Sequence, residues 1–465
     1  MRNTLTLLLL LIVTGLFAQD ITGTWNGMLS FPGGQLRLAI NISKTGTGYT
    51  ATMDSPDQGA SGIPVTAISF VNNTLNFSIE NAKIEYEGTF ENNGFKGTFR
   101  QAGMPIPLYL GRDAVQAAAK PARPQEPKQP YPYHTENVTF KNEKAGITLA
   151  GTLTLPKKEG NYPAVVLISG SGPQNRDEEL MDHRPFLVLA DHLTRNGIAV
   201  LRYDDRGVGE STGNFASATT DDFASDAEAA FNYLKTRKEI NKKKIGLAGH
   251  SEGGTAAPIV ASRNEDMAFI VLMAGSTIPG DDLLLLQNYM LGKSSGMPEA
   301  ELTKLSGINK KIYNAVKEEN NHEAMKQRVS KIFETEMRPV LVSKGIPQGQ
   351  VKEYMDMQVA TMTSPWYVHF IRYNPGPALE KVKCPILAIN GDKDQQVASV
   401  ANLDAVKRAA EKSGNKKVTV KQLPGLNHLF QESATGSPQE YGTIEQTFSP
   451  VALNEISAWI LKQVK

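Results

Sequence analysis

Two rhythms of hydrophobic and polar positions divide the chain. In residues 19–112 apolar and polar residues alternate over short stretches, as in QLRLAINI at 35–42. A two-residue period places the apolar side chains on one face of a strand. Asn-Asn at 72–73 and Asn-Asn-Gly at 92–94 separate such stretches, because Asn and Gly tolerate the positive φ of tight hairpins. The pattern predicts about seven or eight antiparallel strands in a small all-β barrel or sandwich. This part of the chain is either an accessory ligand-binding module or a structural appendage.

A proline-rich stretch ends that region. Residues 113–135 read DAVQAAAKPARPQEPKQPYPYHT, with a proline at almost every third position in the second half. Prolines at this density favour an extended, semi-rigid chain and prevent a helix or a strand ladder. The same composition suits a ligand of an SH3-type domain, but a linker between domains is the favoured interpretation.

From 136 to 465 the rhythm changes to nearly continuous apolar runs separated by helical patterns. The runs are 164–170, 198–204, 244–249, 268–275 and 385–391, and the helical patterns include 184–195, 221–237 and 252–262. Continuous apolar runs are typical of parallel strands that are covered on both faces. We therefore predict an α/β domain with a doubly wound, mostly parallel sheet, whose functional residues gather at the carboxyl ends of the strands.

Residues 281–375 interrupt this alternation with amphipathic helical segments. We expect them to form a helical lid, inserted between two strands and lying over the carboxyl edge of the sheet. Leu283–Leu286 and Trp366-Tyr367 supply apolar side chains there, either for the core of the lid, which is favoured, or for the wall of a substrate pocket.

The N-terminus has the composition of an export signal. Arg2 precedes an apolar segment at 5–17, which is too short to span a bilayer, so residues 1–18 are predicted to be a cleavable signal peptide. Leu16 is larger than the residue usually preferred near a cleavage site, which leaves an uncleaved anchor as the alternative. No cysteine follows the segment for a lipid anchor, and no later apolar run approaches membrane length. The expected location is periplasmic or extracellular, with no membrane span after cleavage.

Composition narrows the functional classes. Lys and Arg number 49 against 48 Asp and Glu, a formal net charge of +1, which gives no electrostatic reason to expect a nucleic-acid partner. The single cysteine, Cys384, excludes an internal disulfide and a cysteine-ligated metal site. Neither a phosphate-binding P-loop nor an H-E-x-x-H zinc motif occurs. The sequence therefore predicts neither a cofactor nor a metal ion.

The sharpest motif is Gly249-His250-Ser251-Glu252-Gly253-Gly254, between an apolar run and a helical pattern. This is G-x-S-x-G in a strand–turn–helix context, in which the serine is a nucleophile on a tight turn. The helix that follows points its N-terminus toward the site and favours developing negative charge. Ser251 is the predicted nucleophile.

A serine needs a base and a group that orients the base. On this fold the expected order along the chain is Ser, then Asp or Glu, then His. Asp392 and Asp394 follow the run at 385–391, and His428 follows the next strand pattern. The pattern alone leaves the choice between the two aspartates open.

Residues 136–465 resemble the α/β-hydrolase superfamily, in the branch of serine esterases and prolyl-oligopeptidase-like acyl hydrolases. The matching segments are SGSGPQNRDE (169–178), RYDDRGVGES (202–211), GHSEGG (249–254), GDKDQQV (391–397) and NH (427–428). The resemblance implies that Asp394 is the acid and Asp392 a turn residue. It also implies a carboxylic ester hydrolase that forms an acyl-enzyme intermediate on short acyl or small aryl esters and needs no cofactor.

The negative charge of the tetrahedral intermediate needs two preorganised donors. The backbone N–H of Glu252 is one, and the loop at 169–172 is expected to supply the other, from Ser171. Many members of the family carry His-Gly where this chain has Ser169-Gly170.

Other polar residues near these motifs have structural interpretations. His250 is expected to pack near the turn. Arg176, Asp177 and 204–206 are expected to form charge pairs that brace the loops, although Arg176 is also a candidate for a substrate carboxylate.

The sequence thus favours an exported serine hydrolase with a small ester as its molecular partner. One alternative is an exopeptidase or acyl-peptide hydrolase with the same triad, for which Glu318-Glu319 and Glu334 are candidate anchors of a peptide amine. Another is an envelope ligand-binding protein whose β domain carries the function and whose hydrolase domain is vestigial.

Overall fold

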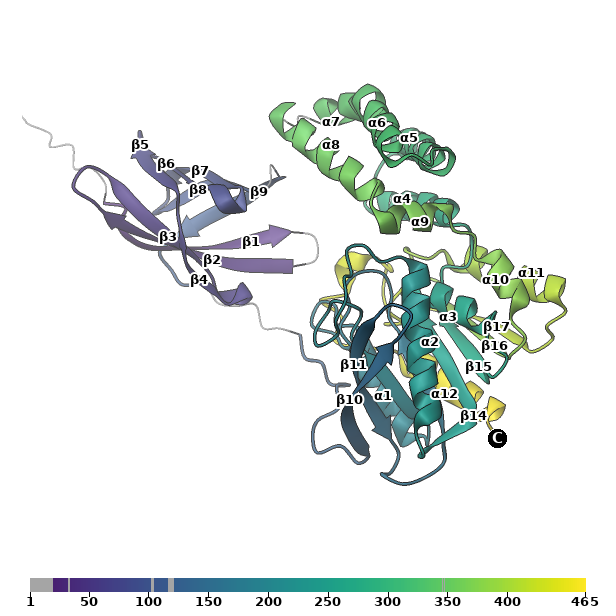
Figure 1. Cartoon of the computed structure of the whole chain (residues 1–465). Coiled ribbons are helices and arrows are strands. Elements are labelled where there is room, and N and C mark those ends of the chain that lie inside the picture. Colours follow the sequence, from purple (N-terminus) through teal and green to yellow (C-terminus); the bar gives the residue numbers. More distant parts are fainter. Residues whose placement is uncertain (1–19, 32–33, 102–103, 116–120, 345, 347) are drawn as a thin grey trace, which may run out of the picture. The chain divides into compact units, whose positions relative to one another are not determined.

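The computed structural model describes residues 20–465 except 32–33, 102–103, 116–120, 345 and 347 (Figure 1). The predicted signal peptide, 1–18, lies outside the described residues. The chain divides into two compact units, residues 1–119 and 120–465. No helix among the described residues combines the length and the apolar character needed to cross a membrane.

The first unit is one antiparallel sheet in the order β4-β3-β2-β1-β9-β8-β7-β6-β5. Its strands are β1 (Gly23–Phe31), β2 (Gly34–Lys44), β3 (Tyr49–Ser55), β4 (Ala60–Pro64), β5 (Ala67–Val71), β6 (Thr74–Ile79), β7 (Ile84–Glu91), β8 (Gly94–Gln101) and β9 (Met104–Gly111), with the 3-10 turns η1 (Pro56–Gln58) and η2 (Glu80–Ala82). β3 and β5, from opposite ends of this order, contact each other, so the sheet curls into a partial barrel. One face is packed into a core that includes Trp25, Phe77 and Phe95.

The predicted number of strands was too low, because the described part of this sheet has nine. β4 and β5 are only five residues long and bury no residue completely, so their sequences mark no clear inner face. The predicted hairpin turns are confirmed: Asn72, Asn73, Asn92 and Asn93 all have positive φ, between 50° and 61°.

The second unit contains an eight-stranded sheet in the order β10-β11-β13-β12-β14-β15-β16-β17. Its strands are β10 (His134–Asn142), β11 (Ile147–Leu155), β12 (Tyr162–Ile168), β13 (Ala199–Tyr203), β14 (Ile240–His250), β15 (Phe269–Met273), β16 (Ile386–Gly391) and β17 (Val418–Leu423). β11 is antiparallel to both of its neighbours, β10 and β13. The six strands β12 to β17 run parallel to one another. The predicted doubly wound, mostly parallel sheet is confirmed.

Helices cover both faces of this sheet. They are α1 (Pro185–Arg195), α2 (Thr220–Thr236), α3 (Gly253–Ala261), α10 (Gly376–Lys381), α11 (Ser399–Ser413) and α12 (Pro450–Gln463), with the 3-10 turn η4 (Pro438–Glu440). Successive residues of β12 serve opposite cores: Val166 packs with α2, α3 and α11, whereas Val165 packs with α1 and α12. Because both faces are buried, the strands are continuously apolar.

A helical insertion separates β15 from β16. It consists of α4 (Gly280–Ser294), α5 (Glu299–Glu318), α6 (His322–Ile332), a π-helical turn η3 (Phe333–Met337), α7 (Arg338–Ser343), α8 (Gln348–Met362) and α9 (Pro365–Arg372). These helices have a hydrophobic core of their own, which includes Ile312, Val329 and Phe370.

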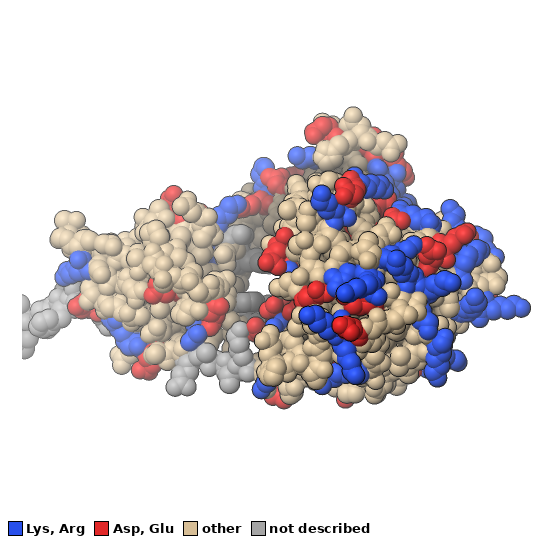
Figure 2. All heavy atoms as spheres, turned by 60° about the horizontal axis from the view of Figure 1, so that its bottom comes forward, with Lys and Arg blue, Asp and Glu red and all other residues tan. Residues whose placement is uncertain are grey.

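Figure 2 shows one face of the molecule, on which acidic and basic side chains are interspersed.

The second half of the proline-rich stretch is not a free spacer. The guanidinium of Arg123 donates to the carbonyl oxygens of Met181 (3.1 Å) and Gly442 (2.9 Å). The side chain of Gln125 accepts the N–H of Thr447 at 2.7 Å and that of Phe448 at 3.0 Å. Arg123 and Gln125 thus belong to the second unit, and these bonds fix the chain around them to the rest of that unit, which composition alone could not indicate.

Candidate active site

The predicted nucleophile lies on a tight turn between β14 and α3. Ser251 has φ 51°, in the left-handed region that residues with a side chain rarely adopt. A Cβ at Gly249 would lie 2.0 Å from the carbonyl oxygen of Gly253, and one at Gly253 would lie 2.2 Å from that of Ile168. The two glycines of the motif are therefore required by close backbone contacts.

The predicted acid and base are hydrogen-bonded to each other. Nδ1 of His428 lies 2.8 Å from Oδ2 of Asp394, and both residues are buried. The other oxygen of Asp394 accepts the backbone N–H groups of Gln396 and Val397, each at 2.8 Å. Asp392 is exposed and accepts the N–H of Gly425 instead. The structure therefore brings Asp394, and not Asp392, to the imidazole.

Ser251 and His428 line one pocket of about 190 Å³. Much of its wall comes from the lid helices α4 and α9 and is apolar. The wall residues on these helices include Leu283, Leu284, Trp366, Tyr367 and Phe370. Leu283 and Phe370 also belong to the core of the lid, so these apolar side chains contribute both to that core and to the wall of the pocket.

The loop after β12 borders the same pocket. The N–H of Gly170 is used by Glu178, whose Oε1 lies 2.7 Å away. Within the described part of the chain, the backbone N–H groups of Ser171 and Glu252 have no protein acceptor. These two groups are the predicted oxyanion donors. Ser171 also donates its hydroxyl to Oε2 of Glu252 at 2.8 Å, which joins the two segments.

The side chain of Glu252 has a role that the sequence did not indicate. It is 2% exposed and accepts hydrogen bonds from the hydroxyl of Thr220 (2.6 Å) and from Nε1 of Trp366 (2.9 Å), besides that from Ser171. Burial raises the pKa of the Glu252 carboxyl, and the three donors oppose the rise. One carboxylate thus links the nucleophile turn to the β12 loop, α2 and the lid.

His250 does more than pack beside the turn. Its Nδ1 lies 2.8 Å from Oε1 of Glu178, and its Nε2 lies 3.0 Å from the carbonyl oxygen of His428. The sequence prediction for this residue was incomplete, because its partners are far away in the chain.

Charge pairs brace the loops around the site, as predicted. Nη2 of Arg176 lies 2.6 Å from Asp204 and 2.6 Å from Glu210, and Arg176 is not among the residues that line the pocket. Asp177 forms an ion pair with Arg202. For Asp205 the prediction of a charge pair was wrong: its carboxyl accepts the hydroxyl of Ser169 at 2.7 Å and the N–H of Gln174 at 3.0 Å, and burial raises its pKa to about 7.

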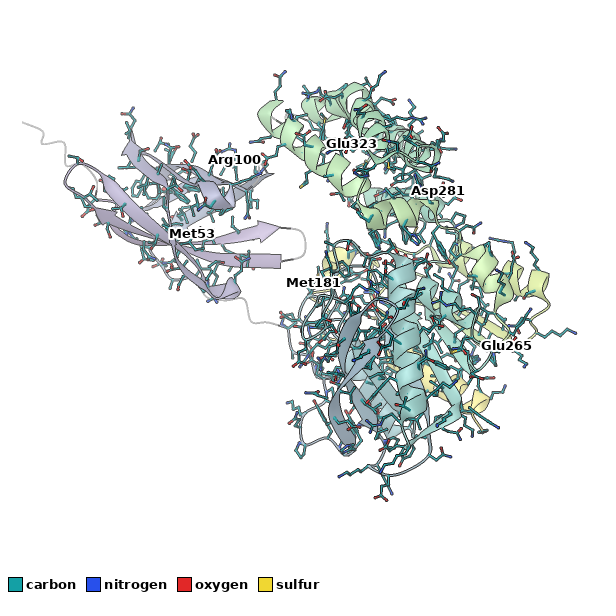
Figure 3. All side chains as sticks on the ribbon, in the orientation of Figure 1. Met53, Arg100, Met181, Glu265, Asp281 and Glu323 are labelled. Atoms are coloured by element: carbon teal, nitrogen blue, oxygen red, sulfur yellow. The ribbon has the colours of Figure 1, made fainter. Side chains whose placement is uncertain are left out.

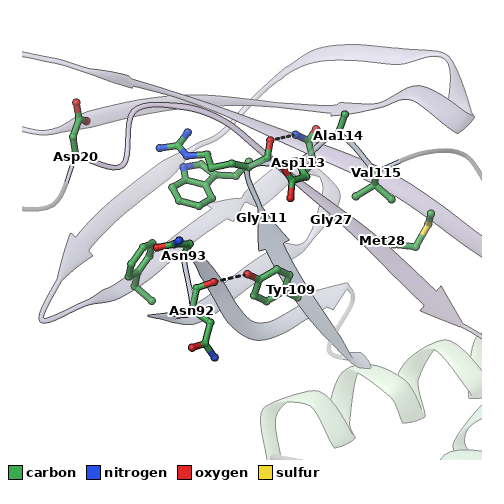
Figure 4. A pocket seen from close by; sticks show the side chains of 14 residues that line it. Asp20, Gly27, Met28, Asn92, Asn93, Tyr109, Gly111, Asp113, Ala114 and Val115 are labelled. Atoms are coloured by element: carbon green, nitrogen blue, oxygen red, sulfur yellow. Dashed lines mark hydrogen bonds between the residues drawn. The ribbon is translucent and has the colours of Figure 1, made fainter.

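A larger hollow, about 800 Å³, belongs to the first unit (Figure 4). The guanidinium of Arg112 stacks over the ring of Trp25 at 3.6 Å, and the hydroxyl of Tyr109 donates to the carbonyl of Asn92 at 3.1 Å. No serine or histidine lines it. The hollow therefore offers no serine–histidine pair. Among the described residues, no group of three or more His, Cys, Asp or Glu could hold a metal ion.

Comparison with known proteins places these residues in a family. The model of the family described as "Serine aminopeptidase, S33" matches residues 184–433, a range that includes Ser251, Asp394 and His428. Esterase EstD of Thermotoga maritima is 26% identical over 318 residues, which cover 68% of this chain and 66% of that protein, just under two thirds. An uncharacterized protein of Pseudomonas aeruginosa is 33% identical over 128 residues, which cover 27% of this chain and 32% of that protein. A solved esterase structure from Pyrococcus furiosus aligns with a TM-score of 0.44 and 16% identity, over 75% of this chain and all of that one.

Proposed function

The chain belongs to the serine aminopeptidase S33 family of α/β hydrolases, and we propose that it cleaves carboxylic esters of small acyl substrates through a Ser251–His428–Asp394 triad. The observation that carries the proposal is the 2.8 Å contact between Asp394 and His428, with His428 and Ser251 on the wall of one pocket. Asp394 holds Nδ1 of the imidazole, so Nε2 is the nitrogen left to act as a base.

The proposed reaction proceeds in two stages. The hydroxyl oxygen of Ser251 attacks the ester carbonyl while its proton passes to Nε2 of His428. The carbon–oxygen bond to the alcohol then breaks, and His428 gives the proton to the departing oxygen. A water molecule attacks the acyl-enzyme, His428 accepts one of its protons, and that proton returns to Ser251 as the acid leaves.

The backbone N–H groups of Ser171 and Glu252 would receive the negative charge of each tetrahedral intermediate. Their lack of a protein acceptor, within the residues described, supports this role. Such donors lower the barrier because they are already oriented toward the oxygen before charge develops.

The pocket favours small, uncharged acyl groups. Its volume of about 190 Å³ is below the range of roughly 300–1,000 Å³ that is usual for drug-sized ligands. The walls from α4 and α9 are aliphatic and aromatic, and no lysine or arginine lines the pocket. An acyl chain of a few carbons would gain apolar contacts there, whereas a charged acid would lose its hydration without a partner.

The description of the family favours aminopeptidase activity as a second candidate. An aminopeptidase needs a carboxylate that can bind the terminal amine of a peptide. Glu318 pairs with Arg328 at 2.6 Å, and Glu319 accepts the N–H of Asn321 at 3.0 Å. Glu334 pairs with Arg338, and none of these three glutamates lines the pocket. The glutamate that does line the pocket, Glu178, is already bonded to His250 and to the N–H of Gly170. The ester substrate is therefore the first candidate.

Export to the periplasm or the medium is part of the proposal and depends on the sequence of residues 1–18 alone. The alternative of a vestigial hydrolase domain is disfavoured, because a protein without catalysis has no need to retain a buried Asp394–His428 pair.

The test compares two substrate series on the full chain. We expect hydrolysis of p-nitrophenyl acetate and butyrate to exceed that of the octanoate ester and of aminoacyl p-nitroanilides. Ser251→Ala should abolish both hydrolysis and labelling by a fluorophosphonate while the protein remains folded. Faster turnover of the anilides would favour the peptidase, and undiminished labelling of Ser251→Ala would refute the nucleophile.

A further inference from the structure

His250 and Glu178 form a second buried imidazole–carboxylate contact beside the proposed triad. His250 is 7% exposed and Glu178 is 5% exposed, and the imidazole rings of His250 and His428 lie 4.8 Å apart between centroids. The catalytic scheme above uses neither residue. Two hydrogen bonds connect the pair to its surroundings in the site: one reaches the carbonyl oxygen of His428, and the other reaches the N–H of Gly170, directly before Ser171.

The geometry fixes one hydrogen on the imidazole of His250 and suggests a second. A backbone carbonyl oxygen can only accept, so Nε2 of His250, 3.0 Å from the carbonyl oxygen of His428, must carry a hydrogen. Nδ1 faces Oε1 of Glu178 at 2.8 Å, and the same oxygen accepts the N–H of Gly170 at 2.7 Å. A hydrogen on Nδ1 would let this oxygen accept from both neighbours, and the imidazole would then carry hydrogens on both ring nitrogens.

The electrostatic surroundings agree with a charged imidazole. Burial lowers the pKa of His250, but the Glu178 carboxylate, the His428 carbonyl and the charge of Asp394 together outweigh it and raise the pKa above its ordinary value. Asp205, on the loop after β13, is a further acidic group near Glu178.

The loop that carries Glu178 is held in an unusual backbone conformation. Glu178, Met181 and Asp182 have φ of 51°, 52° and 62°, and Met181 is labelled in Figure 3. Residues with side chains persist in the left-handed region when surrounding contacts over-determine them, and such residues cluster at functional sites. Here the carboxylate of Glu178 is held by His250 and Gly170, and the carbonyl oxygens of Met181 and Asp182 are held by the guanidinium of Arg123.

We propose that Glu178 and His250 are positioning residues, an ion pair that sets the β12 loop and the backbone of His428 at the correct places around Ser251. Glu178 orients the peptide of Gly170, directly before the proposed donor Ser171. His250 holds the carbonyl of His428 and so limits the position of its imidazole. This inference depends on the proposed esterase function only for its effect on catalysis.

The first measurement is made on the resting full-length protein and needs no substrate. The chain has seven histidines, so ¹⁵N-histidine labelling gives a spectrum that single substitutions can assign. We expect His250 to carry hydrogens on both ring nitrogens at neutral pH and to become neutral in Glu178→Gln. A neutral His250 in the unaltered protein would overturn the assignment, whether or not any ester is hydrolysed.

The second measurement separates positioning from substrate binding. Glu178→Gln should lower kcat for p-nitrophenyl butyrate about 10- to 100-fold and leave KM within about twofold, because small displacements of reacting groups are costly while the apolar walls are unchanged. His250→Gln keeps an N–H that can reach the carbonyl of His428, so it should retain more activity than His250→Ala. Glu179→Gln, an exposed neighbour bonded to Asn175 at 3.1 Å, is the matched control and should match the unaltered protein.

Two outcomes would refute the positioning role. One is an unchanged kcat in Glu178→Gln, and the other is a raised KM with kcat retained, which would make Glu178 a binding group. Thermal unfolding of each variant excludes simple loss of the fold as the cause. If the unaltered protein hydrolyses no ester, the proposed function fails, and the ¹⁵N spectrum still decides whether the pair exists.

Discussion

Replacing Asp394 by Asn tests which aspartate orients the imidazole of His428, the proposed catalytic base. In the native site one oxygen of Asp394 accepts two backbone N–H groups, and the other faces Nδ1 of His428 at 2.8 Å. Asparagine can keep the first oxygen in place, which turns its NH₂ group toward Nδ1. Nδ1 must then accept, so the hydrogen of the neutral imidazole moves to Nε2. Because Nε2 is then a donor, it cannot take the proton of Ser251.

The expected loss follows from this change of tautomer. The same substitution in a Ser-His-Asp triad lowers kcat about 10,000-fold, which corresponds to about 5.5 kcal/mol of transition-state stabilisation. The fold should survive, because both backbone hydrogen bonds and the side-chain volume are retained. The assay is the initial rate of p-nitrophenyl butyrate hydrolysis with thermal unfolding measured in parallel.

Asp392→Asn is the matched control. Its carboxylate is exposed and accepts the N–H of Gly425 at 2.7 Å, which an asparagine oxygen can also do. We expect activity within about twofold of the unaltered protein, because the change leaves His428 untouched. A folded Asp394→Asn protein that keeps more than a tenth of the native rate would refute the tautomer argument, as would an equal loss in both variants.

Three further predictions concern packing and charge. Gly253→Ala should destabilise the fold by about 1–3 kcal/mol and abolish activity, because its Cβ would lie 2.2 Å from a backbone oxygen. Gly307→Ala, in open space on α5, should be neutral or stabilising in denaturant unfolding, and equal effects of the two substitutions would contradict this reasoning. Trp366→Phe removes one of three donors to the buried Glu252 carboxylate and should cost about 1–3 kcal/mol in the free energy of unfolding, and an unchanged value would show that this bond adds nothing. The pKa of Asp205 in the folded protein is about 7, above its ordinary value of 3.8, so between these pH values the native state binds more protons than the unfolded state. The free energy of unfolding should therefore fall as pH rises from about 4 to about 7. Asp205→Asn should flatten that slope in urea titrations, and an unchanged slope would rule this residue out as its source.

The sequence was sufficient for the features that depend on local patterns. The continuous apolar run at 385–391 predicted β16 (Ile386–Gly391), and the pattern at 184–195 predicted α1 (Pro185–Arg195), each to within a residue. The nucleophile turn was readable for a similar reason, because steric crowding forces glycine at fixed offsets from Ser251. The strands β4 and β5 were harder, since they are short and largely unburied.

Long-range polar contacts were not predictable from the same patterns. His250 and Glu178 are 72 positions apart, and Trp366 and Glu252 are 114 apart. Nothing periodic relates such residues, because their encounter depends on where the loops and the lid lie in the finished fold. The attachment of Arg123 to four backbone carbonyls has the same origin, and a proline-rich composition hides it.

Two further contacts, both made by buried glutamates, act together on the β12 loop. Gly170 and Gly172 flank Ser171, and Gly172 has φ 102°, so the loop has little intrinsic stiffness. Glu178 holds the N–H of Gly170 from one side, and Glu252 holds the hydroxyl of Ser171 from the other. With both neighbouring groups fixed, the peptide between them, which carries the N–H of Ser171, has little freedom to rotate. An oxyanion donor must be oriented before charge develops, so a flexible glycine loop held by two buried glutamates would meet that requirement in the role proposed for Ser171, without a bulky side chain near the substrate.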